Sequence, residues 1–194
     1  MTDEHLLIER AQRGEMNAFR ELVERSKINV YRLAYDLTGS RHDAEDLSQD
    51  VFVKAYRSLS QFRHDAKWST WLYRITVNTC MDRRKVKSFT QLSFRDDLDE
   101  GVAAGSMKHS SSLSPEKSAE AGLIRQEIEK ALDRLTSKER SVFVLRHYHD
   151  QSLKQISETL GISEGTVKSF LFRAIRRLQK ALAFYKEDLE LENP

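Results

Sequence analysis

The chain has 194 residues, which at roughly 100–200 residues per domain allows one ordinary domain or two small ones. Its 39% hydrophobic and 32% charged residues, with only 7 Gly and 2 Pro, exclude a fully disordered chain and a turn-dense β fold. Because 32 Lys and Arg nearly balance 30 Asp and Glu, the formal charge of +2 alone indicates no class of partner. The distribution of these charges along the chain has to be considered segment by segment.

The N-terminal part of the chain carries apolar residues at helical spacing with few interruptions. Gly14 and Gly39 are expected to end helices, because glycine adopts the left-handed conformation of a C-terminal cap. Ser69 is expected to be the N-cap of a further helix. The predicted helices span 3–13, about 16–37, 41–58 and 69–87.

One side of the helix predicted at 41–58 is acidic. From Asp36 to Asp50 there are five acids against one base, Arg41. Helical spacings of three and four bring together an acidic face made of Asp43, Asp46, Gln49 and Asp50. Acids near a helix N-terminus also complement the macrodipole, so an ordinary solvated surface is the favoured explanation of this segment taken alone. The charge of the next segment raises the case for a binding surface.

The next segment, from Phe62 to Lys87, has the opposite charge, with seven bases against two acids. Its predicted buried stripe contains Trp68, Leu72, Ile75, Thr79 and Val86. The opposite side, the basic stripe, contains Lys67, Arg74, Asn78, Met81 and Lys85. Cations beside aromatic residues suit single-stranded nucleic acid, because an unstacked base can stack while the backbone is held electrostatically. Core packing is the alternative for both tryptophans and is favoured for Trp68.

Residues 88–114 are rich in Ser and Gly and show no sustained helical or strand period. We interpret them as a flexible linker between an N-terminal domain (1–87) and a C-terminal domain (115–194). A loop folded over a single domain is the alternative, but structureless connections of this length are uncommon inside compact units.

The C-terminal part is helical again by the same criteria. Ser114 before Pro115 is typical of a helix start, and Thr136 with Glu139 has capping-box spacing. Ser152 and Gln155 repeat that spacing. The predicted helices span about 115–134, 137–148, 153–160 and 164–186, and no strand is predicted.

The last two of these helices have the spacing of a helix-turn-helix. Ile156 and Leu160 share one face, Gly161 ends the first helix, Ser163 caps the second, and Val167 falls where the two must touch. An ordinary αα-hairpin is the alternative. The segment from 168 to 186 contains six bases and no acid, which favours phosphate binding over a structural helix.

An exposed aromatic residue, Phe172, is predicted on the polar side of this helix, where it could lie against a thymine methyl group. The candidate DNA contacts form a recognition face of Lys168, Ser169, Phe172, Arg173 and Arg176.

Together the motifs resemble the bacterial extracytoplasmic-function (ECF) sigma factors, the minimal class of RNA polymerase specificity subunit. DAEDLSQDVFVKAY resembles their region 2.2, WSTWLYRITVNTCMDRRK resembles regions 2.3 and 2.4, and residues 135–178 resemble region 4. The resemblance implies an all-α fold of two small helical domains, sigma region 2 and sigma region 4, joined by a flexible linker.

The same resemblance implies roles for these surfaces. The acidic face would bind the β′ coiled coil of core RNA polymerase, with the β flap as a further contact, and the recognition face would contact the minus-thirty-five element of promoter DNA. The minus-ten element would be captured and melted by Arg63, Lys67, Trp71, Arg74, Asn78 and Lys85. The resemblance also implies an anti-sigma factor as a further partner. Phe170, where many members carry Arg, and Ser157, in place of a small apolar residue, depart from the family pattern.

Other classes of function find little support. The six histidines have no spacing typical of a metal site or nucleophile triad, and no glycine-rich phosphate loop occurs, so no enzyme, cofactor or metal is predicted. A helix-turn-helix regulator acting on duplex DNA without polymerase is the alternative function. The single cysteine, Cys80, excludes an intramolecular disulfide and is interpreted as a buried structural thiol rather than a redox sensor. No apolar run approaches the ~20 residues of a membrane span, so a soluble cytoplasmic protein without membrane insertion is expected.

Overall fold

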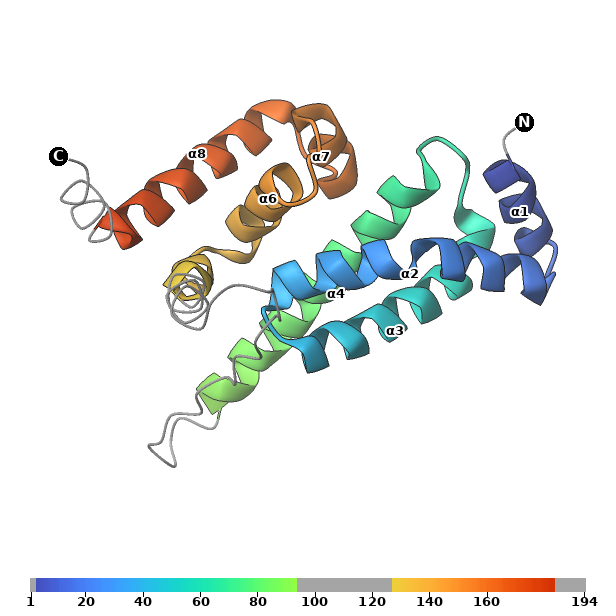
Figure 1. The fold of residues 1–194 in the computed structure, drawn as a ribbon, viewed down its shortest axis with the longest axis horizontal. Helices are drawn as coiled ribbons and strands as arrows, with labels where there is room; N and C mark the ends of the chain where they lie inside the picture. The colour runs from blue at the N-terminus through green and yellow to red at the C-terminus, as the bar shows by residue number, and fades with distance from the viewer. Residues whose placement is uncertain (1–2, 94–126, 184–194) are drawn as a thin grey trace, which may run out of the picture.

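The computed structural model describes residues 3–93 and 127–183, and within these ranges the chain is helical, without a strand (Figure 1). The N-terminal unit consists of α1 (Asp3–Gln12), α2 (Met16–Thr38), α3 (Arg41–Ser58), the short 3₁₀ helix η1 (Leu59–Gln61) and α4 (Trp68–Ser93). The C-terminal unit consists of a helical segment at 127–133, α6 (Ser137–His147), α7 (Leu153–Leu160) and α8 (Glu164–Ala181). The all-α fold class is therefore confirmed.

The longest helix, α4, differs from its prediction at both ends. It begins at Trp68 rather than after Ser69, and it continues to Ser93 rather than ending at 87. Residues 88–93 were assigned to the linker, but the sequence SFTQLS holds no Gly or Pro that would stop a helix. The rest of the predicted linker, the cap at Ser114 and the last turns of the helix predicted to end at 186 lie outside the described residues.

The helix ends follow the local sequence signals closely. Gly39 and Gly161 adopt the left-handed conformation, with φ of 74° and 64°, and close α2 and α7 as predicted. Both predicted capping boxes form, at Thr136 with Glu139 and at Ser152 with Gln155. These caps satisfy backbone donors that a helix leaves unpaired, which explains why short helices such as α7 have sharp boundaries.

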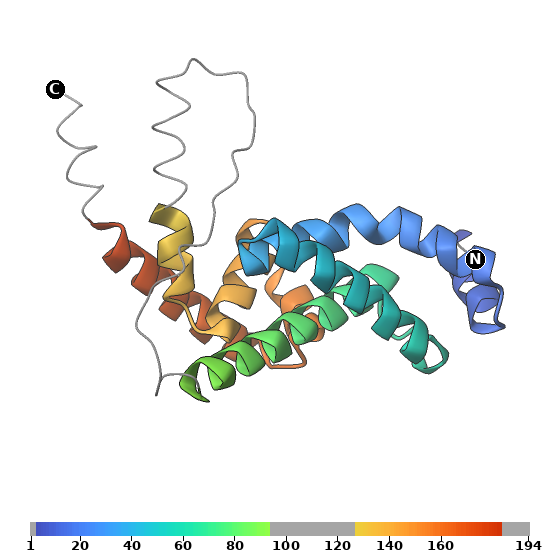
Figure 2. The ribbon, with the colours of Figure 1, turned by 90° about the horizontal axis from the view of Figure 1, so that it is seen from below.

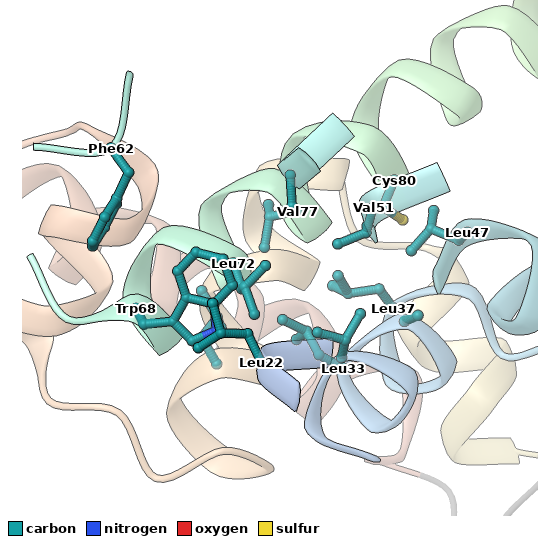
Figure 3. Packing of buried hydrophobic residues seen from close by; sticks show 14 of the residues in the cluster. Leu22, Leu33, Leu37, Leu47, Val51, Phe62, Trp68, Leu72, Val77 and Cys80 are labelled. Carbon is teal, nitrogen blue, oxygen red and sulfur yellow. The ribbon is translucent and has the colours of Figure 1, made fainter. Parts of the chain in front are cut away.

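The core of the N-terminal unit lies where α2, α3 and α4 meet (Figure 3). Helix α1 packs on α2. Each helix contributes leucine or valine side chains that are almost fully buried: Leu22, Leu33, Leu37, Leu47, Val51, Leu72 and Val77. Burying one such side chain contributes roughly 1.5–3 kcal/mol relative to leaving it in water. The predicted buried Trp68 belongs to this core.

The two units pack against each other, which the sequence did not predict. Val142, Leu145, Ile156 and Val167 of the C-terminal unit belong to the same buried cluster as the N-terminal core. The contacts join α4 to α7 and α2 to α6. Figures 1 and 2 show α1 at one end of the molecule and the end of α8 at the other. A second small cluster, around Leu132, holds 127–135 against α8.

Candidate nucleic-acid interface

The helix-turn-helix formed by α7 and α8 has the geometry that its sequence predicts. Ile156 and Val167 are both fully buried, and Ser163 caps α8 by accepting a hydrogen bond from the Thr166 amide at 3.1 Å. The second helix is thereby held across the first, with its outer side free of the core. The outer side of α8 is therefore available to enter a major groove, which is wide enough to hold an α-helix.

The recognition face of α8 is exposed throughout the described structure. Phe172 is 62% exposed, although large aromatic side chains are usually buried, and the guanidinium carbon of Arg176 lies 5.7 Å from its ring centroid. Ser169 donates to the Gly165 carbonyl at 3.0 Å. Phe170, which stands where many ECF sigma factors carry Arg, has a structural role, because its ring is half-buried against the core beneath Arg173.

Two arginines of α8 have an acidic partner that the sequence pattern did not reveal. Glu139 of α6 is 1% exposed, and its carboxylate lies 3.0 Å from Arg177 Nη1 and 3.9 Å from Arg173 Nε. The run of six bases without an acid is therefore partly balanced from another helix. Lys168 and Arg176 are the clearer candidates for phosphate contact, whereas Arg173 also has a structural contact.

The basic stripe of α4 is mostly at the surface. Arg74, Asn78 and Lys85 of α4 are exposed, as are Arg63 and Lys67 in the preceding 62–67 loop. Met81 was predicted to share this stripe, but it is half-buried against the core because α6 covers that side of α4.

An aromatic cluster lies at the base of the 62–67 loop. Trp71 is half-buried, with its ring centroid 5.0 Å from that of Trp68 and 5.2 Å from that of Phe62. The Trp68 indole donates to Ser26 Oγ at 3.1 Å. The prediction that Trp68 packs in the core is thus confirmed, whereas Trp71 is only partly buried.

The packing of the two units brings the basic stripe and the recognition helix to one cleft. Its volume is about 790 Å³, and its lining includes Asn78 and Lys85 of α4 with Phe170, Arg173 and Arg177 of α8. Arg74, one turn before Asn78, donates a hydrogen bond to the Glu158 carbonyl of α7. Both predicted DNA-binding elements therefore face a shared space in this arrangement.

The acidic face of α3 has intramolecular partners of its own. Asp50 accepts a hydrogen bond from Arg83 of α4, and Asp46 lies 3.7 Å from His42. Asp43 belongs to the first turn of α3, where its amide donates to Ser40 Oγ. Gln49 is exposed and lines a separate cleft of about 640 Å³ beside Tyr31 and other α2 residues.

Several polar residues between the units were missed by sequence reasoning. His149 has a nearly buried side chain whose Nε2 lies 3.0 Å from Asp36 Oδ2. Its Nδ1 lies 3.4 Å from the Tyr73 hydroxyl. Arg140 is 2% exposed and donates to the Asp36 carbonyl at 3.2 Å. Burial lowers the pKa of Arg140, and the nearby charge of Arg84 lowers it further.

Cys80 is buried in the same region, as predicted for a structural thiol. Burial raises the pKa of its thiol, and the positive charges of Arg84, Arg140 and Arg83 only partly offset that effect. The thiolate that redox chemistry requires is therefore disfavoured at neutral pH.

Within residues 3–93 and 127–183, no three His, Cys, Asp or Glu side chains lie close enough together to hold a metal ion. In the same ranges, none of the helices combines the length and the apolar character needed to cross a bilayer.

Comparison with known proteins identifies the class to which this arrangement belongs. The chain matches two families, Sigma-70 region 2 over residues 22–90 and Sigma-70, region 4 over residues 125–178. It is 34% identical to the ECF RNA polymerase sigma factor SigW of Bacillus subtilis (strain 168), over 90% of this chain and 94% of that protein. It is 33% identical to the ECF RNA polymerase sigma-E factor of Escherichia coli (strain K12), over 90% and 91%. The chain belongs to the ECF RNA polymerase sigma factors.

Solved structures agree with this fold. The sigma factor RpoE, in complex with the anti-sigma factor NepR from Bartonella quintana, superposes with a TM-score of 0.64 at 24% identity, covering 85% of this chain and 96% of that chain. CnrH, in complex with the cytosolic domain of CnrY, gives a TM-score of 0.63 at 23% identity, covering 93% and 97%. Family membership favours a sigma factor, a transcription initiation factor, over the alternative of a helix-turn-helix regulator that acts without polymerase.

Proposed function

We propose that this sigma factor binds core RNA polymerase through the acidic face of α3 and directs it to a promoter that its two units recognise in two parts. The observation that carries the proposal is the presence of one acidic and two basic surfaces on three different helices, α3, α4 and α8. Charge of opposite sign on separate helices suits one basic protein partner and two stretches of nucleic acid.

The recognition face is proposed to bind the minus-thirty-five element as duplex DNA. Lys168 and Arg176 supply cations for phosphates, and the exposed ring of Phe172 can contact a thymine methyl group in the major groove. Ser169, at the start of the same face, has a hydroxyl that can hydrogen-bond to a base edge.

The basic stripe and the 62–67 loop are proposed to capture the minus-ten element as single-stranded DNA. Arg63, Lys67, Arg74 and Lys85 are cations at the surface, with the Asn78 amide among them. The partly exposed ring of Trp71 offers a surface on which an unstacked base can lie. Capture of an unstacked base would help to open the duplex at the start site.

The acidic face is proposed to bind the β′ coiled coil of the polymerase, with the C-terminal unit contacting the β flap. Gln49 and Asp50 are exposed on α3, and opposite charges on a partner would speed and orient their encounter.

Two weak DNA sites on one chain gain affinity, because binding at one site raises the effective concentration of the other.

An anti-sigma factor is proposed as a further partner, because RpoE and CnrH of similar fold were solved with NepR and with the cytosolic domain of CnrY. The chain is further proposed to act in the cytoplasm and to have no catalytic activity of its own, leaving RNA synthesis to the polymerase.

In vitro transcription with purified core polymerase tests the proposal. Core polymerase from a related bacterium should gain promoter-specific initiation when the full chain is added. Absence of initiation with every such core preparation, together with duplex binding by the chain alone, would favour the regulator instead.

A further inference from the structure

Helix α1 lies outside the residues that match Sigma-70 region 2, yet it contacts the turn that precedes α4 (Figure 1). The side-chain amide of Gln12 donates two hydrogen bonds, to the Leu59 carbonyl at 3.0 Å and to the Phe62 carbonyl at 2.9 Å. These carbonyls stand at the two ends of η1, so one amide group fixes both the entry and the exit of this short turn.

A second contact from α1 reaches the loop itself. The His5 ring centroid lies 4.1 Å from that of His64, and the His64 centroid lies 4.9 Å from that of Phe62. His64 has φ of 61°, a left-handed conformation that is uncommon for residues other than glycine and that surrounding contacts must stabilise. The His5 ring is one of these contacts.

The 62–67 loop is thus held at its base from two helices. Phe62 packs edge-on against Trp68 at 5.7 Å between centroids, and both rings belong to the buried core (Figure 3). The exposed cations of the loop, Arg63 and Lys67, project from this fixed base. A loop ordered before binding loses less conformational entropy when a strand docks on it, which raises affinity.

We propose that Gln12 and His5 of α1 are positioning residues that hold the 62–67 loop in the conformation that captures the minus-ten strand. The inference rests on the proposed function, since it assumes that this loop contacts promoter DNA. Neither residue touches DNA in this mechanism; both act through the backbone and rings of the loop.

The test compares the full chain with its Gln12→Met variant, which keeps the length of the side chain but removes both donors. His5→Ala is the second variant, and Glu4→Ala, at an exposed position of the same helix, is the matched control. Hydrogen exchange of the 59–67 backbone is measured on the free chain. Binding of a single-stranded minus-ten oligonucleotide and of a minus-thirty-five duplex is measured on its complex with core polymerase.

Both test variants should exchange faster at 59–67 and bind the minus-ten strand about tenfold more weakly, because Gln12→Met loses two hydrogen bonds and His5→Ala loses the ring contact with His64. Duplex binding and association with the polymerase should stay within about twofold of the unchanged chain, as should all readouts for Glu4→Ala. A defect that was merely structural would lower every readout together.

Unchanged exchange at 59–67 in both variants would overturn the inference, as would faster exchange with unchanged binding of the strand. If Gln12→Met fails to fold, His5→Ala decides alone, because its side chain is only half-buried. Failure of the unchanged chain to support promoter-specific initiation would instead refute the proposed function, and the DNA role of the loop with it.

Discussion

Arg74 on the basic stripe of α4 donates a hydrogen bond to the backbone carbonyl of Glu158, in the first helix of the helix-turn-helix. A side chain proposed to hold the minus-ten strand is thus occupied by the other DNA-binding unit. The two units also share a buried cluster and a polar contact between His149 and Asp36. The stability of the described structure should therefore depend on contacts between the units as well as within them.

Replacement of His149 by alanine tests that dependence. His149 loses its contacts with Asp36 and Tyr73 and leaves Asp36 without this partner, so the free energy of unfolding should fall by about 1–2 kcal/mol. Urea denaturation of the full chain measures the change. His147→Ala, on the exposed side of α6, is the matched control and should stay within about 0.5 kcal/mol of the unchanged chain. Equal stability of the two variants would show that the contact between the units contributes nothing.

Helix positions and caps could be predicted from the sequence because they depend on residues close together in the chain. The capping box at Ser152 and the left-handed Gly161 are set by a few neighbours. The overrun of α4 to Ser93 shows the limit of this reasoning: a Ser-containing segment without Gly or Pro does not stop a helix.

The contacts between the units could not be predicted, because helical periodicity reveals which side of a helix is polar but not what faces it. Glu139 looked like a capping residue alone, yet it also lies within 3.0 Å of Arg177, 38 positions later by residue number. His149 and Asp36 are separated by 113 positions. Candidate surface residues were found from charge, whereas their intramolecular partners needed the three-dimensional structure.

The Asp50 carboxylate offers a way to separate polymerase binding from internal pairing. Asp50→Arg should weaken association with core polymerase about tenfold or more, because it inverts the charge of the acidic face. It also places two arginines together, since Asp50 pairs with Arg83. The double variant Asp50→Arg with Arg83→Asp restores the internal pair but keeps the inverted charge on α3.

Co-purification with core polymerase measures the association of both variants with the polymerase. Loss of binding in the single and the double variant would support a direct role of Asp50. Recovery of binding in the double variant would mean that only the internal pair matters and would remove Asp50 from the proposed interface.

Phe172→Ala tests the recognition face without disturbing the core, because the ring is 62% exposed. Binding of the minus-thirty-five duplex should weaken by about 1–3 kcal/mol, and mostly on sequences with thymine at the contacted position. Titration of the polymerase complex with matched and thymine-substituted duplexes measures this preference. Gln179→Ala, exposed near the end of the same helix, is the control. An equal loss on all sequences would make the ring a general contact rather than a specific one.

The pH dependence of stability should reveal the buried thiol. Burial raises the pKa of Cys80 above its ordinary value of 9.0, so above that pH the unfolded chain loses a proton that the folded chain keeps. The free energy of unfolding should therefore be unaffected by this group below pH 9.0 and fall as pH rises beyond it.

Cys80→Ala should make that fall shallower, as measured by urea denaturation over a series of pH values. Burial also raises the pKa of Tyr73 above its ordinary value of 10.0. In Cys80→Ala, the free energy of unfolding should therefore still fall above pH 10.0, because of the Tyr73 hydroxyl. The contribution of that hydroxyl should be absent from Tyr73→Phe. An identical pH profile for Cys80→Ala and the unchanged chain would mean that the thiol titrates alike in both states, which contradicts its burial beside Leu37 and Arg140.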